Sequence, residues 1–175
     1  MVTRVALIGL PGAGKSTVAP ILARRLGCPG ADLDREIERR AGRAVRAIFE
    51  DEGEERFRDL ESIALAEALG GEGSLVLACG GGILGRAANR DLLKSRARVV
   101  WLGVDPGEAA KRLPTSGAGE RPLLSGGAPA EGLRALLELR RGAYAAAADA
   151  TVDTDGLAPE EVAERVLARL RAPGL

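Results

Sequence analysis

A glycine-rich loop near the N-terminus constrains the fold of this chain more than any other feature. Residues 9–16 read Gly-Leu-Pro-Gly-Ala-Gly-Lys-Ser and match the pattern G-x-x-x-x-G-K-[ST]. The apolar run 5–8 before the loop predicts a buried strand, and residues 15–26 after it predict a helix. A strand, a glycine loop and a helix in this order form a cradle of backbone N–H groups that binds phosphate. We therefore expect a phosphate loop at residues 9–17 within an α/β fold.

The residues of this loop have separate expected roles around a nucleoside triphosphate. Glycine leaves the concavity free of side chains, so that backbone N–H groups can face the phosphates. Lys15 is expected to reach the β- and γ-phosphates, and the Ser16 hydroxyl is expected to ligate Mg²⁺. The predicted phosphate ligands are Gly12, Ala13, Gly14, Lys15, Ser16 and Thr17.

Further strands and helices alternate along the chain. Continuous apolar runs, typical of strands covered on both faces, are followed by helical patterns, which predicts a parallel sheet. The chain has 175 residues, which suits a single domain over residues 1–175. We expect three layers, a central five-stranded parallel sheet flanked by helices, with ligands at the C-terminal ends of the strands. The further strands are expected at 75–78 and 99–102, with weaker candidates at 30–33 and 150–153, and the further helices at 53–69, 130–148 and 159–170.

Composition and charge exclude several classes of protein. There is no histidine, and the two cysteines lack metal-ligand spacing, which excludes zinc sites and histidine-based triads. Basic and acidic residues balance at 25 each, so no broad nucleic-acid surface is expected. No apolar run reaches the length of a membrane span. Free cysteines fit a reducing compartment, and we expect a cytoplasmic protein that is a monomer and binds neither membranes nor nucleic acid.

Two acidic residues follow the second strand candidate. Asp32 and Asp34 are two positions apart, a spacing that places both side chains on one side of an extended chain. Asp32 is expected to hold Mg²⁺ through water, and Asp34 to accept a proton from an acceptor hydroxyl. The alternative is that Asp34 only caps the N-terminus of a helix over residues 35–41.

Other sequence features limit what the chain does with the nucleotide. A switch GTPase would carry an N/T-K-x-D segment, and neither Lys94 nor Lys111 lies in one. A motor ATPase would end an apolar strand in an acidic residue, whereas the run 75–78 ends in Cys79 and three glycines. Three successive glycines at a strand end favour close approach of the backbone to a ligand over a simple turn.

The ordered set of motifs resembles the shikimate kinase family over nearly the whole chain. The shared motifs are the loop 9–16, Asp32-x-Asp34, the run 53–61 (Gly-Glu-Glu-Arg-Phe-Arg-Asp-Leu-Glu), the glycines 80–82, Arg121-Pro122-Leu123-Leu124, and Arg140 four residues before Tyr144. The resemblance implies ATP-dependent phosphorylation of the 3-hydroxyl of shikimate, with ATP and shikimate as small-molecule partners. The chain departs from the family pattern at Leu33, at Gly142 and at Glu120, which precedes Arg121 in a glycine-rich segment.

The resemblance also assigns residues to the reaction. Lys15, Asp34 and Arg121 would be catalytic. Shikimate would be held partly by a helical region at about 34–61 and partly by residues that follow it in the sequence. The residues implied are Asp34, Arg58, Gly80, Gly81, Gly82 and Arg140. Paired arginines suit a carboxylate, because each guanidinium presents a planar fork of donors. Residues 113–128 would form a mobile lid that carries Arg121, while Arg112 and Pro159 would enclose adenine.

Several alternatives stay open at this stage. Phe49 and Phe57 either wall the acceptor ring or pack in the core, and Glu61, three residues after Arg58, is placed to orient it. A gluconate kinase or a nucleoside monophosphate kinase is a second enzyme class to consider. A nucleotide-sensing module without turnover is the non-enzymatic alternative.

Overall fold

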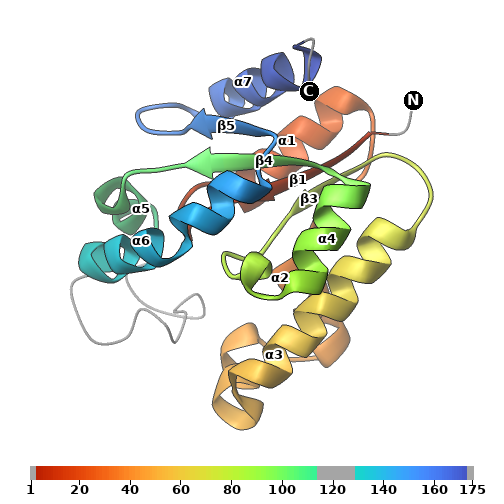
Figure 1. Ribbon diagram of the computed structural model, residues 1–175, viewed down its shortest axis with the longest axis vertical. Helices are drawn as coiled ribbons and strands as arrows, with labels where there is room; N and C mark the ends of the chain where they lie inside the picture. Colours follow the sequence, from red (N-terminus) through yellow and green to blue (C-terminus); the bar gives the residue numbers. More distant parts are fainter. Residues whose placement is uncertain (1–2, 114–128, 173–175) are drawn as a thin grey trace.

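The computed structural model describes residues 3–113 and 129–172, which form a parallel sheet with helices on both faces (Figure 1). The sheet has five strands in the order β2-β3-β1-β4-β5, and each neighbouring pair is parallel. The predicted five-stranded parallel sheet is therefore confirmed. The strands are β1 (Arg4–Ile8), β2 (Gly30–Asp32), β3 (Leu75–Ala78), β4 (Arg98–Gly103) and β5 (Ala150–Asp153).

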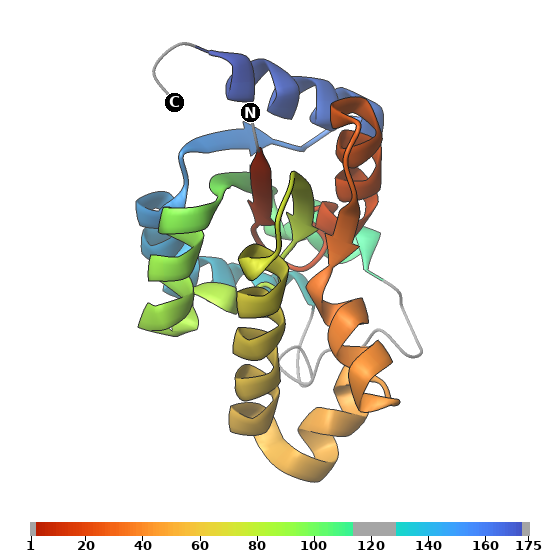
Figure 2. The same cartoon turned by 90° about the vertical axis from the view of Figure 1, so that its right-hand side faces the viewer.

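Helices cover the two faces of the sheet as separate layers. On one face α1 (Lys15–Leu26) packs beside α7 (Pro159–Arg171), and on the other α4 (Ala87–Arg96) packs with α6 (Pro129–Ala147) (Figure 2). The short helix α5 (Pro106–Arg112) packs on α6. At one end of the molecule, α2 (Leu33–Ala41) and the first part of α3 (Val45–Gly70) project beyond the sheet (Figures 1 and 2).

The central position of β1 determines where the loops meet. Its side chains from Val5 to Ile8 are at most 1% exposed, because helices cover both faces, which explains the continuous apolar run. Leu7 pairs with Ala78 of β3 on one side and with Val100 of β4 on the other. The C-terminal ends of these strands therefore lie along one edge of the sheet, where the phosphate loop and the glycine triplet begin.

The second strand and the helix after it differ from the prediction. β2 ends at Asp32 and α2 begins at Leu33, so the strand is one residue shorter than expected. Asp32 is the N-cap residue, and its Oδ1 accepts from Asp34 N at 3.0 Å and Arg35 N at 3.3 Å. The alternative that Asp34 caps this helix is wrong, because Asp34 is already inside the first turn.

The helix expected at 53–69 extends further and is interrupted. α3 begins at Val45, and Gly53 at φ 81° and ψ 173° breaks it into two helical pieces. Positive φ is accessible to glycine at little steric cost, so this break follows from the residue type. The sequence analysis named no helix at α4, α5 or the 3₁₀ turn η1 (Ile83–Gly85). Short and mostly polar helices give little periodic signal.

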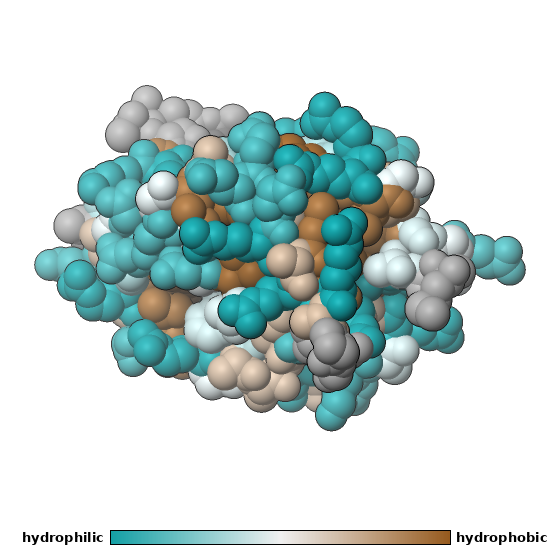
Figure 3. Space-filling view, turned by 90° about the horizontal axis from the view of Figure 1, so that it is seen from above, coloured by the Kyte–Doolittle hydropathy of each residue, from teal (hydrophilic) through white to brown (hydrophobic). Residues whose placement is uncertain are grey.

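The face of the molecule seen in Figure 3 is predominantly hydrophilic, and hydrophobic residues appear there in strips between hydrophilic ones. Among the described residues, the exposed large hydrophobic side chains are Ile63 and Leu139. None of the helices in residues 3–113 and 129–172 combines the length and apolarity needed to cross a membrane.

Substitution by alanine should change the stability of the protein in opposite directions at two glycines. Gly9 lies at φ 141°, and a Cβ placed there collides with the carbonyl oxygen of Leu102, so we expect Gly9→Ala to lower the free energy of unfolding by about 3 kcal/mol. Gly142 lies in α6 with no atom within 4 Å of such a Cβ, so Gly142→Ala should raise it by about 1 kcal/mol. Urea unfolding of both variants measures the difference, and equal effects would contradict this packing of β1 against β4.

Candidate active site

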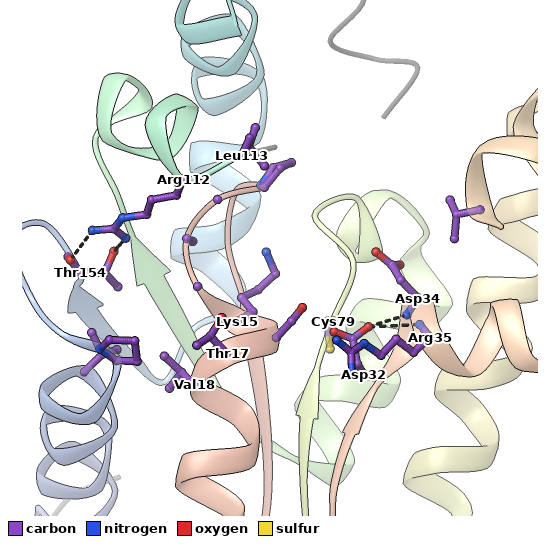
Figure 4. Close-up of a pocket in the computed structure, with 18 of the residues that line it drawn as sticks. Lys15, Thr17, Val18, Asp32, Asp34, Arg35, Cys79, Arg112, Leu113 and Thr154 are labelled. Atoms are coloured by element: carbon purple, nitrogen blue, oxygen red, sulfur yellow. Dashed lines mark hydrogen bonds between the residues drawn. The ribbon is translucent and has the colours of Figure 1, made fainter. Parts of the chain in front are cut away.

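A cavity of about 700 Å³ opens at the C-terminal edge of the sheet. Its walls come from the phosphate loop, the β2–α2 junction, the end of α5 and the turn between β5 and α7. In Figure 4, Lys15 lies in the middle, with Arg112 and Thr154 on one side and Asp32, Cys79 and Asp34 on the other. The predicted site residues that line this cavity are Gly12, Ala13, Gly14, Lys15, Ser16, Thr17, Asp32, Asp34, Arg112 and Pro159.

The phosphate loop leaves the N-terminus of α1 open to a ligand. Gly14 is the N-cap of α1 in the left-handed conformation at φ 89°, and no side chain caps the helix. Gly12, at φ 81°, lies so close to α5 that a Cβ there would collide with the carbonyl oxygen of Ala109. The N-terminus of α1 therefore faces the cavity with the positive end of its dipole, an arrangement that suits an anion.

The Lys15 ammonium group is held inside the loop. Its Nζ donates to the carbonyl oxygens of Gly9 at 2.9 Å and Leu10 at 2.8 Å, and the residue is only 7% exposed. Lys15 therefore projects a buried positive charge into the same concavity that the α1 N-terminus faces, where phosphate oxygens would be its ionic partners.

The predicted metal ligands fit Mg²⁺ carried with a nucleotide. Ser16 and Asp32 line the same cavity, and Asp32 uses Oδ1 for the α2 cap, which leaves the lone pairs of Oδ2 for a water or a cation. In the described ranges no group of three or more His, Cys, Asp or Glu side chains could form a protein-only metal cage. Mg²⁺ keeps several waters and binds one or two protein oxygens plus phosphates, so this small ligand set suits it.

Arg112 is positioned by a residue that the sequence analysis did not identify. Its Nη1 donates to Thr154 Oγ1 at 3.0 Å and its Nη2 to the Thr154 carbonyl oxygen at 2.9 Å. Thr154 is 1% exposed and follows β5 directly, and Pro159, the first residue of α7, lines the same cavity. Arg112 and Thr154 are 42 positions apart, so no local pattern could have indicated this contact.

Asp34 reaches the cavity for a different reason from the one expected. The two-residue spacing of an extended chain does not apply, because β2 ends at Asp32 and Asp34 lies in the first turn of α2. The helix start turns Asp34 toward the glycine triplet. A Cβ placed at Gly80 would lie 3.2 Å from Asp34 Oδ1. Asp34 therefore lies between the phosphate loop and the glycine triplet.

A buried ion pair holds Arg58 against the glycine triplet. Arg58 Nη1 donates to Glu61 Oε2 at 2.8 Å and its Nη2 to Glu54 Oε1 at 3.0 Å, and Glu61 is fully buried. Burial disfavours the charged guanidinium, but Glu61 and Glu54 outweigh it and raise the pKa of Arg58, so Arg58 stays charged. The orienting contact expected from Glu61 is confirmed.

The glycine triplet makes room for these charged side chains. A Cβ at Gly80 would collide with Glu61 Oε1, and one at Gly82 would lie 2.5 Å from Arg58 Nη2. The sequence analysis attributed the triplet to close approach of a ligand. The structure adds that Gly80 and Gly82 are needed for close approach of the protein's own ion pair. Burial raises the pKa of the neighbouring Cys79 thiol, which therefore stays protonated and is no nucleophile.

Part of the predicted site lies beside the cavity or outside the described residues. Arg140 is on α6, half-buried, one helical turn before Tyr144, whose hydroxyl donates to the Gly81 carbonyl oxygen at 2.7 Å. The predicted residues Arg58, Gly80, Gly81, Gly82 and Arg140 are not among the residues that line the cavity. Arg121 and residues 114–128 of the expected lid lie outside the described residues.

The two phenylalanines pack with each other. Their ring centroids are 4.6 Å apart, Phe57 is 4% exposed, and neither residue lines the cavity. The Arg58 guanidinium carbon lies 5.3 Å from the Phe57 ring centroid. Core packing, with support for Arg58, therefore describes Phe57 better than a wall of the cavity does.

Comparison with known proteins agrees with this arrangement. A family model described as shikimate kinase matches residues 11–171. A shikimate kinase of Thermobifida fusca is 47% identical over 168 residues, which cover 96% of this chain and 95% of that protein. One of Symbiobacterium thermophilum is 41% identical over 170 residues, 97% of each chain.

Solved structures give the same result. The shikimate kinase of Acinetobacter baumannii in complex with shikimate superposes with a TM-score of 0.93 at 38% identity, covering 100% of this chain and 96% of that one. A gluconokinase of Sinorhizobium meliloti, at 19% identity and a TM-score of 0.62, covers 96% of this chain and 91% of its own and shares the fold alone. The chain therefore belongs to the shikimate kinase family.

Proposed function

We propose that this protein transfers the γ-phosphoryl group of MgATP to the 3-hydroxyl of shikimate and releases ADP and shikimate 3-phosphate. The observation that carries the proposal is that Lys15 of the phosphate loop and Asp34 face the same cavity, while Asp34 and the Arg58–Glu61 ion pair both lie against the glycine triplet. Relatives at 41–47% identity over nearly the whole chain are named shikimate kinases, which supports shikimate as the acceptor.

The phosphate-loop half of the cavity would bind the nucleotide. The backbone of residues 12–17 and the α1 N-terminus would surround the β- and γ-phosphates, with Lys15 turning from its carbonyl partners to phosphate oxygens. Mg²⁺ would be held by Ser16 and, through water, by Asp32, and would neutralise charge on the β- and γ-oxygens. Arg112, fixed by Thr154, and Pro159 would enclose the adenine ring.

The other half would bind the acceptor. Shikimate carries one carboxylate and three hydroxyls. The planar guanidinium groups of Arg58 and Arg140 suit the carboxylate, and the Asp34 carboxylate can accept hydrogen bonds from hydroxyls. The buried Glu61 fixes the guanidinium of Arg58, so little conformational freedom remains to be lost on binding. Backbone N–H groups of the triplet Gly80–Gly82 would donate to a further hydroxyl.

Transfer requires little covalent chemistry from the protein. The 3-oxygen of shikimate forms a bond to the γ-phosphorus as the bond from that phosphorus to the β,γ-bridging oxygen breaks, and the hydroxyl proton passes to Asp34. Lys15 and Arg121 would neutralise the charge on the transferring group. Arg121 and its lid stay a prediction, based on the need to exclude water that competes with the acceptor hydroxyl.

The alternatives explain fewer of the observations. A nucleoside monophosphate kinase would need a second base pocket, which the cavity lining does not suggest. The likeness to a gluconokinase extends to the fold alone, whereas relatives above 40% identity carry the name shikimate kinase. A sensor without turnover would not need a buried ion pair that keeps Arg58 charged against the glycine triplet.

We also propose how the molecule is organised and where it works. Residues 1–175 would form one domain, with a phosphate loop at 9–17, an acceptor-binding helical region at about 34–61 and a lid at about 113–128. Free cysteines support a reducing cytoplasm. Balanced charge and scattered exposed apolar residues support a monomer with small-molecule partners rather than nucleic acid.

Acceptor specificity is the direct test of this function. A coupled ADP-release assay with MgATP should show turnover with shikimate and none above background with gluconate or nucleoside monophosphates. Turnover with gluconate alone would contradict the proposal, and tight ATP binding with no acceptor turned over would favour the sensor.

Removing the charge of Asp34 should affect the chemical step. For Asp34→Asn we expect kcat to fall roughly 10²–10⁴-fold, the typical contribution of a positioned general base, with the Kd for ATP unchanged. Asp91→Asn makes the same charge change at an exposed position of α4 and should retain wild-type turnover. Steady-state kinetics and calorimetry measure both variants, and wild-type kcat in Asp34→Asn would exclude Asp34 from catalysis.

Substitution of Thr154 should weaken the binding of ATP and leave the binding of shikimate unchanged. Thr154→Val keeps the side-chain shape but removes the side-chain acceptor of one Arg112 hydrogen bond, so we expect the KM for ATP to rise about 3- to 10-fold, as for the net loss of one typical hydrogen bond. Thr154→Ser should restore it, and the KM for shikimate should not change in either variant. A rise in both KM values would indicate a general folding defect instead.

A further inference from the structure

A buried tyrosine on α6 joins the two elements that carry the proposed acceptor ligands. Tyr144 is 1% exposed, and its hydroxyl donates to the Gly81 carbonyl oxygen at 2.7 Å, across 63 positions of sequence. Arg140 lies one turn earlier on the same helix. The Tyr144 hydrogen bond therefore connects the helix of Arg140 with the glycine triplet.

This hydrogen bond determines how one peptide plane of the triplet is oriented. The carbonyl oxygens of Gly80 and Gly82 accept from Ile83 N at 3.1 Å and Gly85 N at 2.9 Å, so the turn itself engages them, whereas Gly81 uses Tyr144. No cis peptide occurs in the described residues, and in a trans peptide C=O and N–H point in opposite directions. With Gly81 C=O directed at Tyr144, the N–H of Gly82 points away from α6.

The sheet fixes the position of the Tyr144 hydroxyl. The Tyr144 ring lies against Trp101 of β4, with centroids 5.6 Å apart and planes inclined by 37°. α6 also contacts β4, α4 and η1, so the ring cannot shift without repacking this layer. Through this hydrogen bond, the packing of α6 on β4 fixes the position of the triplet. The Arg58 guanidinium is a second neighbour of the triplet, at Gly82.

We propose that Tyr144 is a positioning residue for the acceptor: its hydroxyl holds the Gly81–Gly82 peptide so that the Gly82 N–H is directed at the bound acceptor, at a constant distance from Arg140. The inference rests on the proposed function. It assigns Tyr144 a role that core packing alone does not require, because a phenylalanine would fill the same volume. Without the hydroxyl, the Gly81 carbonyl loses this donor and its peptide plane is free to rotate.

Tyr144→Phe tests the inference in the full-length protein. We expect the KM and the calorimetric Kd for shikimate to rise roughly tenfold, which corresponds to about 1.4 kcal/mol. The KM for ATP should stay within about twofold of wild type, because the hydroxyl donates to Gly81, which is not among the residues that line the cavity of the phosphate loop. A purely structural role would lower the Tm and leave the ratio of the two KM values unchanged.

Val166→Ala is the matched control for stability. It removes part of a fully buried side chain from α7, on the other face of the sheet, and leaves Tyr144, Trp101 and Gly81 in place, so it should lower the Tm without raising the KM for shikimate. An equal rise of this KM in both variants, an unchanged KM in Tyr144→Phe, or a Tyr144→Phe protein that does not fold would each overturn the inference. Wild-type protein is assayed alongside: absence of shikimate turnover there would contradict the proposed function itself.

Discussion

The parallel pairing of β1 with β3 on one side and with β4 on the other brings three strand ends to one edge of the sheet, and the whole site depends on this alignment. The phosphate loop follows β1 and the glycine triplet follows β3, so the strand register determines their separation. Gly9 passes so close to β4 that no side chain fits between them. The loop that would bind phosphate is thus anchored by the most buried strand of the molecule.

Charged groups are placed in this site by rigid contacts before any ligand arrives. Lys15 is held by loop carbonyls, Arg58 by the buried Glu61, and Arg112 by Thr154. Taking a charge out of water is costly unless it is hydrogen-bonded or paired. Lys15 and Arg112 donate hydrogen bonds to protein oxygens, and Arg58 is also paired with Glu61. Preorganised charge of this kind suits phosphoryl transfer, where catalysis consists mainly of positioning and electrostatic stabilisation.

Sequence reasoning succeeded where the signal is local and failed where it depends on packing. The phosphate loop was predicted in its full structural context, because its glycines, lysine and flanking elements are contiguous. Asp34 was predicted to face the site, but through strand periodicity, whereas the α2 start at Leu33 with Asp32 as the cap places it there. The helical piece that begins at Val45 was missed, whereas the expected helix began at Gly53, the residue at which the structure breaks α3.

The sequence by itself determined the sheet, the phosphate-binding loop and, through the order of its motifs, membership in the shikimate kinase family. Only the tertiary structure decided why Gly80 and Gly82 carry no side chains: Glu61 and Arg58 occupy the space that such side chains would need. It also decided the partners of Arg112 and Gly81, which lie 42 and 63 positions away. Such contacts form between elements that meet only after folding, and a side chain's partner across that distance leaves no periodic or motif signal in the chain.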